Sequence, residues 1–428
     1  MTGVTGTGAR PRRTLTDVTV GESEETVLFN PLEPGYVQDP YTQFAALRDH
    51  EPVHHTLVGP WAVFRYEDVF ALLRDATLSV DDANLRMEES ERAAMFEELI
   101  AEYGRDERGS RAILNLDPPD HTRLRKLVSK AFTPRTVERL GARVEQLVTD
   151  TLDAAADRGE MDVVCDLAFP LPFTVISELL GMPEGDREQI RGWSHAMTKT
   201  LDPIITPADA RAAFEASDAM SRYLHEAVAW KRDHPADDLL TGLLQAEEDG
   251  DRLSADELRD QVVLLFIAGH ETTVNLIGNG VLALLRNRDQ LERWRDDPSL
   301  DASAVDELLR YDSPVQFSRR ITLREHRVGG QELEPGVFVF AALASANRDP
   351  RHWGDDADEL DLGRAHAGTH LAFGSGAHYC LGAALARLEG RLAISGLIRR
   401  FPALDLAGEP VYNGRINLRG LEQLPVRF

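Results

Sequence analysis

The stretch that decides the fold is His370-Leu371-Ala372-Phe373-Gly374-Ser375-Gly376-Ala377-His378-Tyr379-Cys380-Leu381-Gly382. Glycines surround its cysteine, and glycine permits turns and close backbone approaches that other residues resist. An apolar pattern with helical spacing follows directly, at Leu381, Ala384, Leu385 and Leu388. We therefore expect Cys380 on a tight loop just before a helix, where the helix dipole and free amides favour a thiolate.

The cysteine has two interpretations. Free cysteines are usually buried and inert, so Cys380 alone would be a core residue on a glycine turn. An accessible thiolate is instead a suitable ligand for haem iron. The pattern Phe-Gly-x-Gly-x-His-x-Cys-x-Gly resembles the haem-binding signature of the cytochromes P450 and matches it at every fixed position. The resemblance implies haem b as cofactor, Cys380 as axial metal ligand, His378 at a haem propionate, and Phe373 and Gly382 near the ring.

The composition is that of an ordinary soluble protein, with 428 residues, 43% hydrophobic and 28% charged. The net charge of −25 argues against nucleic acid and anionic membranes as partners. Two cysteines cannot form a disulfide framework, which fits a reducing cytoplasm. Cys165 lies in an apolar run and is expected in the core. Residues 1–28 are predicted to be a flexible tail without a membrane anchor, and residues 29–428 a single domain.

The segment 262–285 is long enough to span a bilayer, but it carries His270 and Glu271. An ionised glutamate in the middle of a bilayer costs several kcal/mol, so we expect a buried central helix. Ser254-Ala255-Asp256-Glu257 is a capping box that would open this helix.

Ala268-Gly269-His270-Glu271-Thr272-Thr273 lies within that helix. A threonine there can simply bond back to a carbonyl of its own helix. The segment also resembles the P450 oxygen-activation motif. The resemblance implies that Ala268 lies against the haem, that Thr272 interacts with dioxygen, and that Glu271 relays protons.

Asp117-Pro118-Pro119-Asp120-His121 marks a helix start. His121 and Arg125 are four residues apart and share one face, which by itself would be an ordinary solvated face. In the P450 family such a pair binds haem propionates through charge-assisted hydrogen bonds. Basic residues fill the rest of this segment, and Arg123, Lys126 and Lys130 are expected to point outward toward an acidic redox partner.

Glu307-Leu308-Leu309-Arg310 places an acid and a base three residues apart, which is usually a weak surface ion pair. The family resemblance implies a buried structural pair completed by Arg364. Arg320 is the expected propionate ligand, with Arg319 as the alternative.

We also expect hairpins at 53–64 and 416–428 and small strands over 321–342. Substrate contacts are expected from 77–112, 170–205, 264–272, 315–320 and 418–421.

Together the motifs predict a mainly α protein with small β-sheets, in the P450 fold, with haem between the central helix and the cysteine loop. The resemblance implies a monooxygenase that hydroxylates or epoxidises an apolar small molecule. Electrons would come from a ferredoxin or flavodoxin and its NAD(P)H reductase. Two alternatives stay open, a peroxide-driven enzyme and a haem sensor or carrier without catalysis. The sequence leaves the substrate open.

Overall fold

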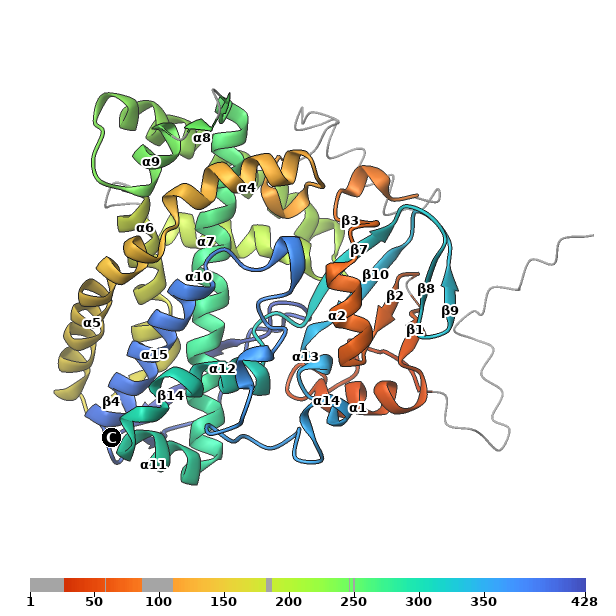
Figure 1. The fold of residues 1–428 in the computed structure, drawn as a ribbon. Coiled ribbons are helices and arrows are strands. Elements are labelled where there is room, and N and C mark those ends of the chain that lie inside the picture. The colour runs from red at the N-terminus through yellow and green to blue at the C-terminus, as the bar shows by residue number, and fades with distance from the viewer. Residues whose placement is uncertain (1–26, 58, 87–110, 182–186, 246, 249–250) are drawn as a thin grey trace, which may run out of the picture.

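The computed structural model describes residues 27–57, 59–86, 111–181, 187–245, 247–248 and 251–428. It is mainly helical with small sheets, as the sequence predicted, and Figure 1 shows α10 running through its middle. The longer helices are α1 (Tyr41–His50), α2 (Tyr66–Arg74), α4 (Asp120–Ala131), α5 (Pro134–Ala156), α6 (Pro170–Leu180), α7 (Arg187–Thr198), α8 (Pro207–Asp233), α9 (Leu239–Gln245), α10 (Ala255–Arg286), α11 (Arg288–Asp296), α12 (Asp301–Tyr311) and α15 (Ala383–Arg400). Two single-turn helices, α13 (Leu343–Ala346) and α14 (Pro350–Trp353), follow the sheet.

The central helix α10 begins at the predicted capping box. Ser254 Oγ accepts from the Glu257 amide at 3.2 Å, and Glu257 Oε2 accepts from the Ser254 amide at 2.9 Å. Further along, α15 packs closely on α10, because a Cβ at Gly390 would lie 2.8 Å from Leu276. The segments Val163–Leu180 and Ala255–Arg286 are apolar enough to cross a bilayer, but 67% and 61% of their most apolar windows are buried in the fold. Both are therefore core helices here.

The main sheet lies beside this helical part (Figure 1) and has the strand order β1-β2-β10-β7-β3. The predicted hairpin at its edge is confirmed, since β1 and β2 pair antiparallel. Its strands are β1 (Val53–His55), β2 (Trp61–Val63), β3 (Leu78–Ser79), β7 (Phe317–Thr322) and β10 (Phe338–Ala342). The predicted small strands after β7 also form, as the hairpin of β8 (His326–Val328) and β9 (Gln331–Leu333).

The predicted C-terminal hairpin is wrong. The last two strands, β13 (Leu421–Gln423) and β14 (Pro425–Arg427), are separated by Leu424 alone, which leaves no room for a turn. They join different sheets instead. β13 pairs with β12 (Val411–Tyr412), and β14 pairs with β11 (Asp405–Leu406) and β4 (Glu160–Asp162). A short pair of β5 (Glu247–Glu248) and β6 (Asp251–Arg252) precedes α10.

Cys165 is also not a core residue. It lies on a π-helical turn, η3 (Val163–Ala168), whose apolar side chains Val163, Val164 and Leu167 are buried while Cys165 is exposed. The apolar run is therefore correctly predicted as core, but its extra residue per turn directs the cysteine outward.

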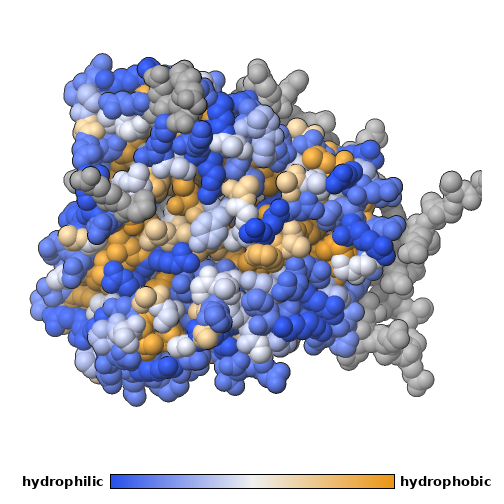
Figure 2. Space-filling view, in the orientation of Figure 1, coloured by the Kyte–Doolittle hydropathy of each residue, from blue (hydrophilic) through white to orange (hydrophobic). Residues whose placement is uncertain are grey.

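Hydrophilic side chains cover most of the face in Figure 2, and hydrophobic ones are confined to a band across its middle. Most of the predicted tail at 1–28 and most of the pocket segment 77–112 lie outside the described residues, which exclude 1–26 and 87–110 among others. The division into a tail and a single domain stays a prediction.

Candidate functional site

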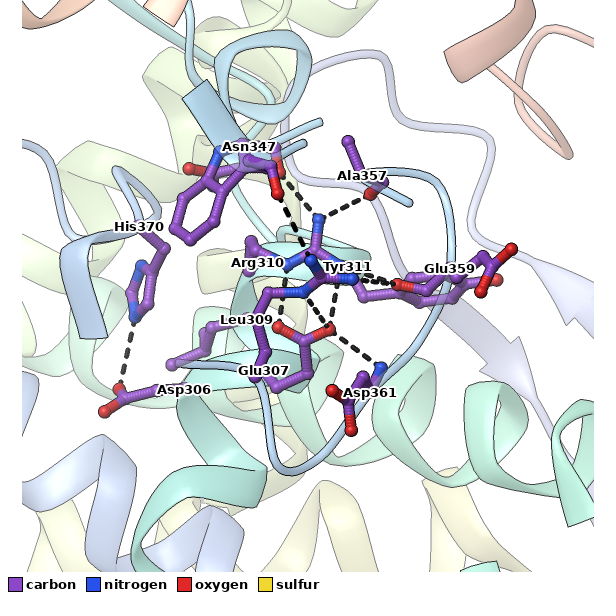
Figure 3. Close-up of polar contacts among 12 residues, drawn as sticks. Asp306, Glu307, Leu309, Arg310, Tyr311, Asn347, Ala357, Glu359, Asp361 and His370 are labelled. Carbon is purple, nitrogen blue, oxygen red and sulfur yellow. Dashed lines mark hydrogen bonds and ion pairs between the residues drawn. The ribbon is translucent and has the colours of Figure 1, made fainter. Parts of the chain in front are cut away.

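A buried ion cluster fixes the chain that leads to the cysteine loop (Figure 3). Glu307 and Arg310 are fully buried on α12, and both oxygens of Glu307 pair with Arg310, at 2.7 and 2.8 Å. Arg364 completes the cluster, as predicted, with its Nε 3.1 Å from Glu307 Oε1. Arg310 donates further to the carbonyls of Asn347, Ala357 and Glu359. The cluster therefore ties α12 to the loop over residues 354–364.

The same region anchors the start of the cysteine loop. His370 Nε2 lies 3.2 Å from Asp306 of α12, and the Leu371 amide donates to Asn347 Oδ1 at 2.7 Å. Gly376 has a φ of +72°, and a Cβ there would lie 2.9 Å from the Leu73 carbonyl, so only glycine fits without a shift. The Cys380 amide donates to the Phe373 carbonyl at 2.9 Å, which closes the loop.

Cys380 stands just before α15, as predicted, since that helix begins at Ala383. Its side chain is accessible, but it lies deep enough in the protein that burial raises the pKa of the thiol. Because the sulfur is accessible although it lies so deep in the protein, we infer that it faces an internal cavity. The Gly382 amide, Arg125 and Arg387 lower the pKa of the thiol, in the direction the sequence predicted, but burial outweighs them and the net effect is a raised pKa. A cation bound to the sulfur would favour the thiolate further.

Four basic side chains lie close together near Cys380: His121, Arg125, Arg320 and His378. The rings of His121 and His378 lie 4.1 Å apart, between α4 and the cysteine loop. Arg125 Nη2 donates to the Tyr379 carbonyl at 2.6 Å. Burial, with the neighbouring His121, Arg320 and Arg125, lowers the pKa of His378 to about 3. Burial likewise lowers the pKa of Arg320 to about 10.

These four side chains have no carboxylate within ion-pair distance among the described residues. Both ring nitrogens of His121 are buried without a hydrogen-bond partner. Arg320 donates only to the Ser318 hydroxyl and to the carbonyls of Arg319 and Leu73. Arg319, on the other face of β7, pairs with Asp82 at 3.0 Å. The Arg320 guanidinium keeps its charge at neutral pH, and a buried charge without an ion pair is unfavourable, so this group of basic side chains suits an anion.

The central helix supplies the other predicted residues. Ala268 is exposed although α10 is otherwise largely buried around it, so it too borders an internal cavity. Thr272 Oγ1 donates to the Ala268 carbonyl at 2.9 Å, which is the back-bonding that the sequence allowed. Its oxygen lone pairs remain able to accept. The side chain of Glu271 is 18% exposed and lies beside His270 rather than beside the cysteine loop.

Two buried polar groups were missed by the sequence reasoning. Glu389 on α15 is 1% exposed, faces Thr273, and has a pKa raised to about 8 by burial. His270 is fully buried with one unpartnered ring nitrogen. Each is a polar residue within an apolar helical stretch, which is the sequence signal that could have found it.

Comparison with known proteins identifies the family. The family model described as Cytochrome P450 matches residues 84–297 and 298–411. Cytochrome P450 107B1 of Saccharopolyspora erythraea is 44% identical over 96% of this chain and 99% of its own. The chain belongs to the cytochrome P450 family. Vitamin D(3) 25-hydroxylase of Pseudonocardia autotrophica is 42% identical, covering 91% of this P450 and 94% of its own chain. P450BioI, solved with an acyl carrier protein ligated to hexadec-9Z-enoic acid, has a TM-score of 0.83 at 36% identity, covering 92% of this P450 and 99% of that chain.

Haem b is accordingly the cofactor of this P450 monooxygenase, and O2 is its cosubstrate. The site fits haem on its own chemistry. Haem carries two propionates, and the four basic side chains near Cys380 have no ion pair with a carboxylate among the described residues. The iron needs a thiolate, and Cys380 is accessible at the same place.

Proposed function

We propose that this P450 monooxygenase inserts one oxygen atom of O2 into an apolar small molecule, by hydroxylation or epoxidation, with Cys380 as the axial iron ligand. The observation that carries the proposal is the accessible Cys380 thiol close to basic side chains that have no ion pair among the described residues. The long helix that carries Ala268 and Thr272 packs against the helix that begins beside the thiol.

The basic side chains would hold the cofactor. His121, Arg125, Arg320 and His378 would bind the propionates, and the separate ion pair of Arg319 with Asp82 favours Arg320 over its neighbour. Phe373 would pack near the ring, with Gly382 on the same side and Ala268 on the other. Gly382 suits this position, since a Cβ built on it meets no atom within 4 Å.

Thr272 and Glu271 would deliver protons. When bound, the haem iron with its thiolate ligand supplies the activation of O2. Thr272 already donates to Ala268, so its oxygen is set to accept a hydrogen bond from a protonated neighbour. Glu271, the adjacent side chain with partial access to solvent, would bring that proton in.

The substrate would be a large aliphatic molecule. The relatives named for vitamin D(3) 25-hydroxylation and for a hexadec-9Z-enoic acid complex support this class. A role in secondary metabolism, or in lipid or xenobiotic breakdown, would follow. A screen of secosteroids, macrolides and long-chain acyl compounds for the substrate-induced change in haem spin state tests it.

An acidic ferredoxin or flavodoxin, reduced by an NAD(P)H reductase, would dock on α4 in the cytoplasm. Lys126 and Lys130 are exposed there. Arg123, which was expected to point outward with them, is partly exposed and pairs with Asp251 at 3.1 Å and with Glu257.

Oxygen-dependent NAD(P)H consumption with product formation tests the reaction class. Peroxide-driven turnover without reductase would favour the peroxygenase alternative, and haem reduction without product from any substrate would favour a sensor.

Thr272→Ala should keep haem and substrate binding but divert reducing equivalents to peroxide. Unchanged product per NAD(P)H in that variant would remove Thr272 from proton delivery.

A further inference from the structure

His270 occupies a closed aromatic cage behind the oxygen-activation segment. Its ring lies 5.8 Å from each of Phe169, Phe173 and Phe266, centroid to centroid. The side chain is fully buried, and burial lowers the pKa of the imidazole. The ring is therefore neutral at neutral pH and carries one proton.

The helix itself decides which nitrogen carries that proton. Nδ1 lies 3.0 Å from the Phe266 carbonyl, one turn back on α10. A carbonyl only accepts, so Nδ1 must be the donor. Nε2 is then a bare acceptor, and it is buried without a hydrogen-bond partner. A buried acceptor without a partner is unfavourable by about 1–3 kcal/mol.

The polar atom that faces Nε2 is Glu271 Oε1, at 3.7 Å. A carboxylate cannot satisfy an acceptor, whereas a carboxylic acid can. The pair therefore becomes complementary only when one proton lies between Nε2 and Oε1.

Two basic side chains act on the Glu271 carboxylate. Arg415, from the loop before β13, and His195 on α7 both interact electrostatically with its carboxylate. Arg191 on α7 acts on His270 and stacks 4.1 Å from the Phe169 ring. The ionised form of Glu271 thus has partners toward Arg415 and His195, and the protonated form has one in His270.

We propose that His270 is a positioning residue for proton delivery, whose Nε2 accepts the proton of the Glu271 carboxylic acid and so holds Glu271 in its loaded form. This inference rests on the proposed role of Glu271. The carboxyl gives its proton toward Thr272, becomes a carboxylate facing Arg415 and His195, and takes the next proton from solvent. His270 gains and loses no net proton in the cycle.

The test is infrared difference spectroscopy of the carboxylic-acid carbonyl stretch on the resting holoenzyme. Glu271→Gln identifies the band. His270→Phe fills the cage and removes the acceptor, so the band should shift to the frequency of a free acid. His270→Gln keeps an acceptor oxygen and should keep the band near the frequency of the wild type.

The matched control is His352→Phe, which removes an imidazole stacked on Tyr66, outside the α10 cage. It should leave the band unchanged. A Glu271 band that is indifferent to His270→Phe, or no Glu271-dependent acid band at any pH at which the protein is folded, would overturn the proposal. If His270→Phe does not fold, the wild-type band position decides, since a free-acid frequency contradicts the hydrogen bond.

Turnover gives a second and separable readout. Product per NAD(P)H should fall in His270→Phe, and this loss should disappear in a Glu271→Gln background, because His270 acts through Glu271. A wild-type enzyme that forms no product with any reductant would contradict the proposed function. The infrared band is read without turnover and would still decide the role of His270.

Discussion

Replacing Arg320 with methionine tests the anion-binding role of the basic side chains near Cys380. Arg320 is 4% exposed and contacts only neutral oxygens. Burial lowers the pKa of its guanidinium to about 10, which corresponds to about 3 kcal/mol of unfavourable desolvation. The negative charge of a haem propionate would offset this desolvation free energy. Because the pKa stays near 10, the charge is present throughout the neutral range.

Loss of a hydrogen bond to a charged group costs about 1.5–3 kcal/mol, so Arg320→Met should release haem roughly 10- to 100-fold faster. The assay is transfer of haem from the ferric protein to an excess of apomyoglobin. Arg319→Met is the matched control, because Arg319 is the neighbour on the same strand and already pairs with Asp82. Equal haem loss from both variants, or no acceleration in Arg320→Met, would refute the reasoning.

Three further predictions concern the scaffold and the redox surface. Glu307→Ala should lower the free energy of unfolding by about 3–5 kcal/mol, because it leaves the buried Arg310 without its acid and removes one of the two acids that pair with Arg364. Glu359→Ala, at an exposed side chain, should not, and urea unfolding measures both. Glu389 keeps its proton in the folded protein up to about pH 8 but loses it near pH 4.5 in the unfolded chain. The free energy of unfolding should therefore fall as the pH rises between these two values, by up to about 1.4 kcal/mol per pH unit. Glu389→Gln should flatten this pH dependence. Lys126→Glu and Lys130→Glu should slow the reduction of the haem by ferredoxin but not by dithionite, and the effect should shrink at high salt. Equal slowing by both reductants would mean that the substitutions damaged α4.

Features encoded locally were predictable. The capping box at Ser254, the loop around Cys380 and the Glu307–Arg310 pair each depend on residues within a few positions of one another. These three predictions are confirmed, because helix caps, glycine turns and i, i+3 pairs form through contacts between residues that are close in sequence.

Features set by distant partners were not predictable. The ion pairs of Arg123 depend on Asp251 and Glu257, more than a hundred residues away. The last strands join separate sheets because their partners come from earlier chain segments, which no local pattern shows. The exposure of Cys165 depends on a π-helical turn, and the unpartnered nitrogen of His270 depends on a cage built from two helices.

The central claim is that Cys380 is the thiolate ligand of the haem iron, and the spectrum of the reduced carbon monoxide complex tests it most directly. The wild-type protein and Cys165→Ser, which alters only the exposed cysteine on η3, should both give the red-shifted Soret band of thiolate-ligated haem. Cys380→Ser should lose that band. A red-shifted band that persists in Cys380→Ser, or that disappears in Cys165→Ser, would contradict the account.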